Sequence, residues 1–137
     1  MGKQAKASLR VRYQETDQMG VVHHANYIKW FEVGRTELLR ELGTDYRTVE
    51  EQGLLLPVIE VTCQYKKPAL YDDEILILSR VSKYTGVKLT FAYEVYRGDE
   101  LLVTGTTTHC WTTPQFKPVN LKKAWPELHQ LITSCVS

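Results

Sequence analysis

The sequence predicts an α+β fold in which one long helix packs against an antiparallel sheet. Three observations support this class. Apolar residues recur every three or four positions between residues 27 and 42, which is the period of an amphipathic helix. Apolar and polar residues alternate in several other segments, as they do in strands with one wet face. Short turns separate the later strands, and tight turns join antiparallel neighbours, because parallel strands need longer crossover connections.

The first predicted strand spans residues 8–13, where Leu9, Val11 and Tyr13 alternate with polar side chains. It delivers the chain into a polar loop at residues 14–25. This loop runs directly into the segment with the helical period, so the first strand and the helix are close neighbours in sequence.

The long helix is predicted from Asn26, as the N-cap, to Gly43, as the C′ residue in a left-handed conformation. Gly34 falls within the apolar face, where it costs roughly 1 kcal/mol of helix propensity against alanine. We therefore expect Gly34 to allow close packing against a sheet. The apolar face consists of Tyr27, Ile28, Phe31, Gly34, Leu38, Leu39 and Leu42.

The second half of the chain is predicted to be mainly strands. Residues 44–56 form a connector with a short helical turn at 46–52. Gly98-Asp99 and residues 84–86 fit tight hairpin turns, so we expect an antiparallel meander. The four strands of this meander are predicted at 58–67, 74–83, 87–97 and 100–112.

A last helix is predicted over residues 122–136. Pro126 leaves the residue at which it starts open, because proline is tolerated only in the first turn of a helix. The side chains expected to face inward are Trp125, Leu128, Leu131 and Ile132.

Length and composition narrow the function classes. A chain of 137 residues is long enough to bury a core and predicts one domain over residues 1–137. The formal charge is +1 and no cationic run occurs, which gives no support to a nucleic-acid or membrane-surface role. No apolar run is long enough for a signal peptide or a membrane span, so we expect a cytoplasmic protein.

The three cysteines do not suggest a structural role. Cys63, Cys110 and Cys135 are odd in number and lack Cys-x-x-Cys spacing, which argues against a disulfide framework and against a structural zinc site. We expect inert thiols. The four histidines likewise give no metal-binding spacing: His23 and His24 are adjacent, so their side chains should diverge, and no third ligand is placed by spacing. His109 and His129 are expected to be structural or surface residues.

The loop before the helix is the candidate site. Asp17, Gly20, His23 and His24 precede the first helical turn, whose unpaired backbone N–H groups and partial positive charge suit an anion or oxyanion. A plainer interpretation also holds for these residues, namely that Asp17 caps a turn and Gly20 supplies a positive φ. The residues by themselves leave both interpretations open.

The residues from 13 to 40 resemble the motif of hotdog-fold acyl-CoA thioesterases of the 4-hydroxybenzoyl-CoA thioesterase type. The resemblance covers about a fifth to a quarter of the chain. The sequence is similar to the branch of small bacterial acyl-CoA thioesterases associated with the Tol–Pal system, in which histidine follows Val-Val-x, as His24 does here. The matching residues are Tyr13-x-Glu-Thr-Asp17-x-Met-Gly20-Val-Val-x-His24-Ala-Asn26-Tyr27-x-x-Trp30-Phe31-Glu32-x-x-Arg35-x-Glu37-x-Leu39-Arg40.

This resemblance implies a single hotdog domain, with a five-stranded antiparallel sheet wrapped around one long central helix and a short C-terminal helix. One helix leaves the other face of a sheet uncovered. The family implies that two subunits pair their sheets edge to edge, with active sites at the dimer interface, and we expect a homodimer or a homotetramer.

The implied activity is hydrolysis of an acyl-CoA thioester without a cofactor or metal. By resemblance, Asp17 is the nucleophile or general base, and the backbone N–H of His24, or of a neighbour in residues 22–26, is the oxyanion donor. The His24 ring is a second candidate for polarising the carbonyl or holding Asp17, and the Tyr13 hydroxyl is a possible support. Glu15 and Glu37 belong to the motif but are expected at the surface or in salt bridges.

Other functions stay open at this point. The second hypothesis is hydrolysis of acyl groups carried on acyl carrier protein, since the same site would serve either carrier. The third is a non-catalytic protein that binds acyl thioesters, and the presence of Asp17 argues against it. Lys66, Lys67 and Lys88 are available for coenzyme A phosphates, although no spacing selects them. The acyl group is not determined by the sequence.

Overall fold

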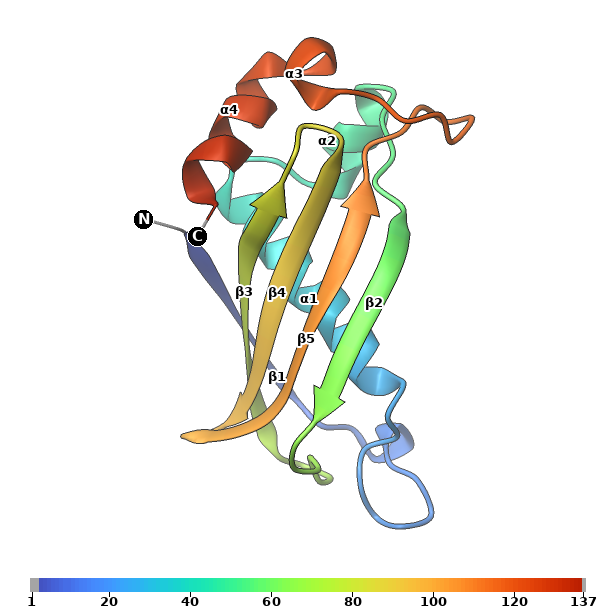
Figure 1. The fold of residues 1–137 in the computed structure, drawn as a ribbon. Helices are drawn as coiled ribbons and strands as arrows, with labels where there is room; N and C mark the ends of the chain where they lie inside the picture. The colour runs from blue at the N-terminus through green and yellow to red at the C-terminus, as the bar shows by residue number, and fades with distance from the viewer. Residues whose placement is uncertain (1–2, 137) are drawn as a thin grey trace.

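The computed structural model describes residues 3–136, and its elements follow the predicted order (Figure 1). Among these residues, no helix combines the length and the apolar character needed to cross a bilayer. The elements are β1 (Gln4–Arg10), a 3₁₀ turn (Tyr13–Glu15), α1 (Asn26–Glu41), α2 (Tyr46–Glu51), β2 (Val58–Tyr65), β3 (Glu74–Tyr84), β4 (Lys88–Arg97), β5 (Glu100–Cys110), α3 (Leu121–Ala124) and α4 (Pro126–Cys135).

The sheet has the order β1-β3-β4-β5-β2, with every pair antiparallel. The hairpins that join β3, β4 and β5 confirm the predicted meander for these three strands. For β2 the prediction is wrong, since β2 pairs with β5, with Cys63 opposite Gly105. The reason is that β1 occupies the outer edge of β3, with Ala7 opposite Ile77, so the free edge of the meander is that of β5.

The first strand begins and ends earlier than predicted. Val11 still donates its N–H to the carbonyl of Asp73, at 2.9 Å. The chain then turns, because the Glu15 side chain accepts the N–H of Arg12 and closes a 3₁₀ turn. Tyr13 therefore leaves the strand pattern, and its side chain is 76% exposed.

The long helix begins without the predicted side-chain cap. Ala25 is the N-cap and makes no capping bond, while Asn26 is the first helical residue. The Asn26 amide instead donates to the carbonyl of Glu15, at 2.9 Å, so it ties the helix to the preceding turn. At the other end the prediction is confirmed: Gly43 has φ +89 and donates its N–H to the carbonyl of Arg40.

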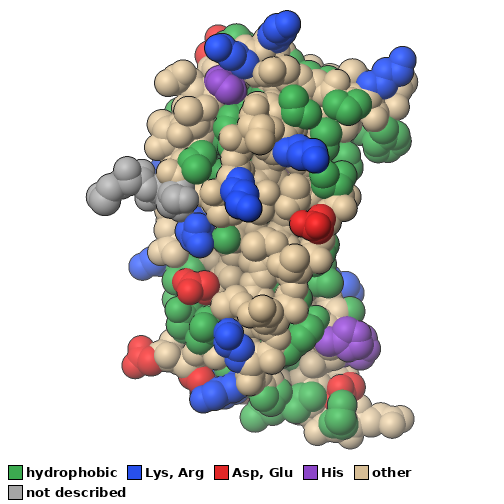
Figure 2. Space-filling model, viewed as in Figure 1, with side chains coloured by type: hydrophobic (Ala, Val, Ile, Leu, Met, Phe, Trp, Pro, Cys, Tyr) green, Lys and Arg blue, Asp and Glu red, His purple; other side chains and the backbone are tan. Residues whose placement is uncertain are grey.

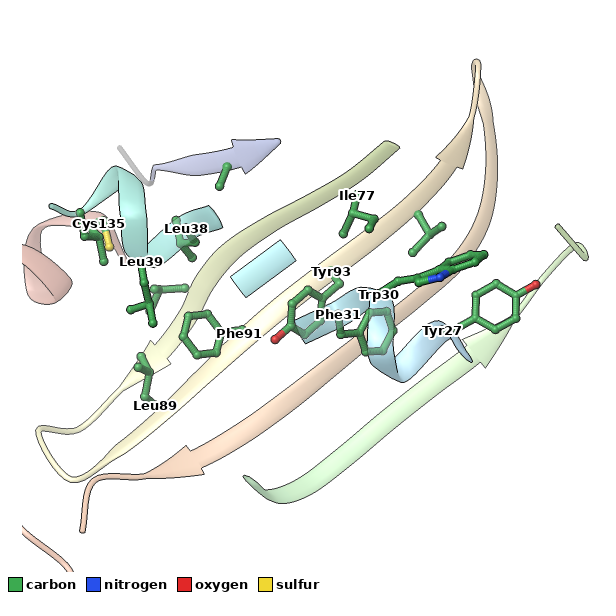
Figure 3. Close-up of a cluster of buried hydrophobic side chains, with 14 of the residues drawn as sticks. Tyr27, Trp30, Phe31, Leu38, Leu39, Ile77, Leu89, Phe91, Tyr93 and Cys135 are labelled. Carbon is green, nitrogen blue, oxygen red and sulfur yellow. The ribbon is translucent and has the colours of Figure 1, made fainter. Parts of the chain in front are cut away.

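The core lies between α1 and the inner face of the sheet (Figure 3). Phe31 stacks on Tyr93 of β4, with ring centroids 4.4 Å apart, and full burial of such a side chain contributes roughly 1.5–3 kcal/mol. Gly34 confirms its predicted role, because an added Cβ would lie 2.9 Å from the Cγ2 atom of Ile77. Gly105 on β5 gives similar room to Phe31. Glycines on both layers thus allow the helix to approach the sheet closely.

The C-terminal segment forms two short helices instead of one. Pro126 is the first residue of α4, a position where its missing N–H costs nothing. Leu128 and Ile132 are buried as predicted, and Leu131 is exposed, contrary to the prediction. Both helices lie at the end of the sheet that also holds α2, opposite the polar loop (Figure 1).

The outer face of the sheet is open in this chain. Threonine hydroxyls pair across its strands, Thr62 with Thr106 and Thr90 with Thr108. Figure 2 shows this face with its basic side chains separated from one another instead of forming one patch. The expected uncovered sheet face is therefore present, and it is mainly polar.

Candidate functional site

The polar loop is a miniature hairpin that presents Asp17. Thr16 and Val22 form an antiparallel bridge, and Asp17 donates its N–H to the carbonyl of Val21, at 2.8 Å. Gly20 has φ +80 and donates back to the Asp17 carbonyl. The loop thus has a defined backbone, and the predicted positive φ of Gly20 is confirmed.

The Asp17 side chain has one occupied and one free oxygen. Its Oδ1 atom accepts the N–H of Met19, at 2.8 Å, which is the turn-capping contact of the plainer interpretation. Its Oδ2 atom has no hydrogen-bond or ion-pair partner within residues 3–136. The capping contact fixes the carboxylate and leaves Oδ2 available for chemistry.

A groove of about 280 Å³ lies beside this carboxylate. Three segments form it: the loop, the first turn of α1, and the end of β2 with the residues that follow. Its walls are largely apolar, and two lysines lie at its rim. The lining residues are Asp17, Met19, Val21, Val22, His24, Tyr27, Tyr65, Lys66, Lys67 and Pro68.

The peptide groups at the entry of α1 are held in a definite orientation. The carbonyl of His24 accepts the hydroxyl of Tyr65, at 3.1 Å, and the N–H of Ala25 donates to Nδ1 of His23, at 3.2 Å. The N–H of His24 has no acceptor within the described part of the chain. It lies two residues before the start of α1, where the helix dipole is positive, so it is suited to bind an oxyanion.

Tyr65 connects the two sides of the groove. Desolvation raises the pKa of its hydroxyl to about 12, so the hydroxyl is protonated and donates at neutral pH. The neighbouring Tyr27 accepts the N–H of Ala69 and contacts Tyr65 edge to face, with centroids 5.4 Å apart. The N–H of Val22 is bound by the carbonyl of Ala69, at 2.9 Å. The β2–β3 connection therefore holds both the loop and the helix.

The predicted site residues separate in the structure. Asp17 and His24 line one groove, whereas Tyr13 does not line it and packs edge to face on Tyr71, with centroids 5.8 Å apart. Of the three candidate lysines, Lys66 and Lys67 line the groove and Lys88 does not. Sequence reasoning did not identify Tyr65 as part of the site, because its alternation on β2 is that of any strand residue.

The two adjacent histidines stack, contrary to the expected divergence of their side chains. Their ring centroids are 4.3 Å apart at an interplanar angle of 27°. Both are exposed, and the His24 ring also forms a T-shaped pair with Tyr65, with centroids 6.4 Å apart. No group of three His, Cys, Asp or Glu side chains within residues 3–136 is arranged to hold a metal ion.

Glu15 was expected at the surface or in a salt bridge. The salt bridge is present, since the Arg12 guanidinium lies 3.7 Å from Oε1 of Glu15, whereas the surface position is wrong. Its side chain is buried, with hydrogen bonds to Arg12 and Trp30. The Glu37 side chain does form the expected surface salt bridge, with Arg40. The motif positions of the two glutamates therefore have different structural roles.

Comparisons with known proteins agree with this architecture. The family model of the thioesterase-like superfamily matches residues 11–124. The putative acyl-CoA thioesterase YneP of Bacillus subtilis is 41% identical over 127 residues, which cover 91% of this chain and 92% of YneP. The acyl-CoA thioesterase YbgC of Haemophilus influenzae is 35% identical over 117 residues, covering 84% of this chain and 86% of YbgC.

A solved structure shares almost the whole fold. The DHNA-CoA thioesterase from Staphylococcus aureus superimposes with a TM-score of 0.92 at 33% sequence identity, covering 96% of this chain and 89% of that chain. The range that matches the family model includes every residue that lines the groove.

Proposed function

The chain belongs to the thioesterase-like superfamily, and we propose that its groove beside Asp17 is where it hydrolyses an acyl-CoA to a free carboxylic acid and CoA. The hotdog fold and the family predicted from the motif are confirmed by these relatives. One observation carries the assignment of the site: Asp17 and His24 line the same groove, and within residues 3–136 neither Oδ2 of Asp17 nor the N–H of His24 has a hydrogen-bond partner.

Thioester hydrolysis needs few groups. The carbonyl of a thioester is already reactive, because sulfur donates little electron density to it and thiolate is a good leaving group. What remains is a base or nucleophile and a donor for the tetrahedral oxyanion. We assign the first role to Asp17 and the second to the backbone N–H of His24. No metal or cofactor is required by this scheme.

Asp17 acts as a general base in this proposal. Its Oδ2 atom takes a proton from a water molecule, the water oxygen attacks the thioester carbonyl, and the oxyanion is stabilised by the His24 N–H. Collapse of the intermediate breaks the carbon–sulfur bond, and the leaving CoA thiolate takes the proton from Asp17, which restores the carboxylate. His24 also lines the groove, and we assign its ring a contact with the attacking water.

Direct attack by Asp17 is the alternative, and an isotope experiment detects it where water opens the mixed anhydride at the Asp17 carbonyl. In a single turnover in ¹⁸O-water with enzyme in excess, general-base catalysis places the heavy oxygen in the product acid. If the peptide that contains Asp17 gains the heavy oxygen while the product acid does not, Asp17 is the nucleophile and the general-base proposal is wrong.

The substrate experiment is a panel of aromatic and aliphatic acyl-CoA esters, followed by thiol release. The same acyl groups on acyl carrier protein test the second hypothesis, since the groove would serve either carrier. We expect thiol release to be faster from the CoA esters than from the acyl carrier protein esters. We also expect a metal chelator to leave the rate of thiol release unchanged. Binding of acyl-CoA without any thiol release would instead indicate a non-catalytic protein.

We further propose that subunits pair through β2. The strand lies at an edge of the sheet, and its exposed residues include Ile59, Val61 and Tyr65. An exposed apolar edge strand is a template for pairing with another chain. A homodimer formed in this way, or a homotetramer that also uses the open outer face, would place two grooves near the shared edge.

A cytoplasmic location is also proposed. Cys63, Cys110 and Cys135 are free thiols, the state in which cysteines are kept in reducing compartments. Cell fractionation with an antibody to the protein tests this location, and recovery in an oxidising compartment would contradict it.

A further inference from the structure

Glu15 is a buried residue outside the groove, and its carboxylate contacts Arg12, which precedes the Asp17 loop and also pairs with it through the guanidinium at 3.7 Å, and Trp30 of α1. Its side chain is only 8% exposed. The Oε1 atom accepts the backbone N–H of Arg12, at 2.8 Å, and the Oε2 atom accepts the indole N–H of Trp30, at 3.0 Å. Arg12 precedes the loop, and Trp30 lies in the second turn of α1, so the carboxylate joins the loop entrance to the helix.

The backbone carbonyl of Glu15 makes a second connection. It accepts the N–H of His23, at 2.8 Å, and the side-chain amide of Asn26, at 2.9 Å. These residues lie on either side of His24, whose N–H is the proposed oxyanion donor. The backbone carbonyl of Glu15 therefore joins the loop entrance to the loop exit. Its carboxylate joins the loop entrance to the helix.

We propose that Glu15 is a positioning residue for thioester hydrolysis: it holds the Asp17 carboxylate in register with the N–H of His24. This inference rests on the proposed function of the groove. Asp17 follows Glu15 by two residues, and the Thr16–Val22 bridge transmits the position of Glu15 through the hairpin. Glu15 itself lines no part of the groove, so it acts on the reaction through Asp17 and not on the substrate.

The chemistry of the two bonds explains why a carboxylate is required. Each oxygen accepts one N–H, from Arg12 and from Trp30. A glutamine side chain has one accepting oxygen and one donating NH₂ group. In Glu15→Gln the NH₂ group would therefore face one of these two N–H groups, and neither donor would have an acceptor. A buried donor without an acceptor is unfavourable, and the turn would shift to relieve it. A shift of roughly 1 Å at a catalytic group lowers the rate by as much as about 10²-fold.

The test separates kcat from KM in purified full-length protein. Glu15→Gln and Trp30→Phe are each expected to lower kcat by roughly 10- to 100-fold while KM for acyl-CoA changes little, because neither Glu15 nor Trp30 lines the groove. The double variant should be no slower than the slower single variant, since both changes remove the same connection.

The control for a loss of stability alone is Tyr84→Phe, which removes the hydrogen bond between Tyr84 and His129 at the opposite end of the sheet. It is expected to lower the melting temperature without changing kcat. If Glu15→Gln retains wild-type kcat in a folded protein, or if Tyr84→Phe loses as much kcat for the same change in melting temperature, Glu15 has no positioning role.

Two further measurements distinguish this inference from the proposed function. Asp17→Asn and the wild type are assayed in parallel with the Glu15 variant. If the wild type is active, Asp17→Asn is inactive and the Glu15 variant has normal activity, only the positioning role is overturned. If the wild type releases no thiol, the proposed function fails. Amide hydrogen exchange then still tests the connection, because Glu15→Gln should speed exchange of the N–H of Asp17 and His23, and unchanged exchange there overturns the inference.

Discussion

Gly34 of α1 lies so close to Ser79 of β3 that a Cβ atom on the glycine would overlap the serine hydroxyl. With any other residue at position 34, the side chains of Ser79 and Ile77 would have to move for the helix to stay at this distance from the sheet. The absence of a side chain thus permits the close packing that compensates for the weak helix propensity of glycine.

Gly34→Leu should therefore destabilise the protein. Overpacking a tight site costs about 1–3 kcal/mol or more, and the free energy of unfolding, measured with a chemical denaturant, checks this. Val33→Leu is the matched control, because Val33 is the exposed neighbour on the same helix. An equal or higher stability of Gly34→Leu would mean that the helix is free to move away from the sheet.

Asp17→Asn should lower kcat by roughly 10²-fold or more, the scale of losing a catalytic base. The asparagine oxygen can still accept the N–H of Met19, so the loop should keep its shape. Asp99→Asn, in the β4–β5 turn, is the control and should keep full activity. Near-normal turnover by a well-folded Asp17→Asn protein would remove Asp17 from the mechanism.

His24→Ala should reduce kcat less than Asp17→Asn does. The proposed oxyanion donor is the backbone N–H, which the substitution leaves in place, and the carbonyl that binds Tyr65 is also retained. Steady-state kinetics of both variants on one acyl-CoA make the comparison. A loss as large as that of Asp17→Asn would assign the chemical role to the imidazole ring.

The stability of the protein should fall in acid because of His109. This side chain is buried between the carbonyl of Leu56 and the hydroxyl of Thr107, at 3.1 and 2.9 Å. Desolvation lowers its pKa from 6.5 to about 4. Between these two values the unfolded chain binds more protons than the folded chain, so folding stability rises with pH in this window and is lost as pH falls through it.

The slope from this one group is at most about 1.4 kcal/mol per pH unit. Denaturant unfolding of the wild type between pH 4 and 6.5 measures it, and His109→Leu should have a smaller slope there. His24→Ala serves as the control because its ring is exposed. An unchanged slope in His109→Leu would show that other groups cause the acid sensitivity.

The assembly should depend on β2. We expect light scattering to give the mass of a homodimer or homotetramer for the wild type, and Val61→Lys to shift it toward the monomer, because a charge on an edge strand opposes pairing. Leu131→Lys places the same charge on an exposed apolar position of α4 and should leave the mass unchanged. A fully active monomer at assay concentrations would contradict the proposed assembly.

Much of the fold could be predicted because its signals are local. The apolar period of α1, the left-handed Gly43 and the hairpins of β3, β4 and β5 depend on residues within a few positions of one another. The motif that begins at Tyr13 also indicated the family and placed Asp17 and His24 in one short segment. In the structure both residues line one groove, as expected for residues so close in sequence.

Other features depend on contacts between distant parts of the chain, and the tertiary structure alone decided them. The pairing of β2 with β5 follows from which sheet edge remains free, which no period in β2 reveals. Tyr65 binds the carbonyl of His24 across 41 residues of sequence. Glu15 is polar and lies in a loop motif, so local patterns predict exposure, yet the indole of Trp30 gives it a buried partner. Periodicity describes which face a residue shares with its neighbours in sequence, whereas burial and hydrogen bonding are determined by whatever the folded chain brings to that face.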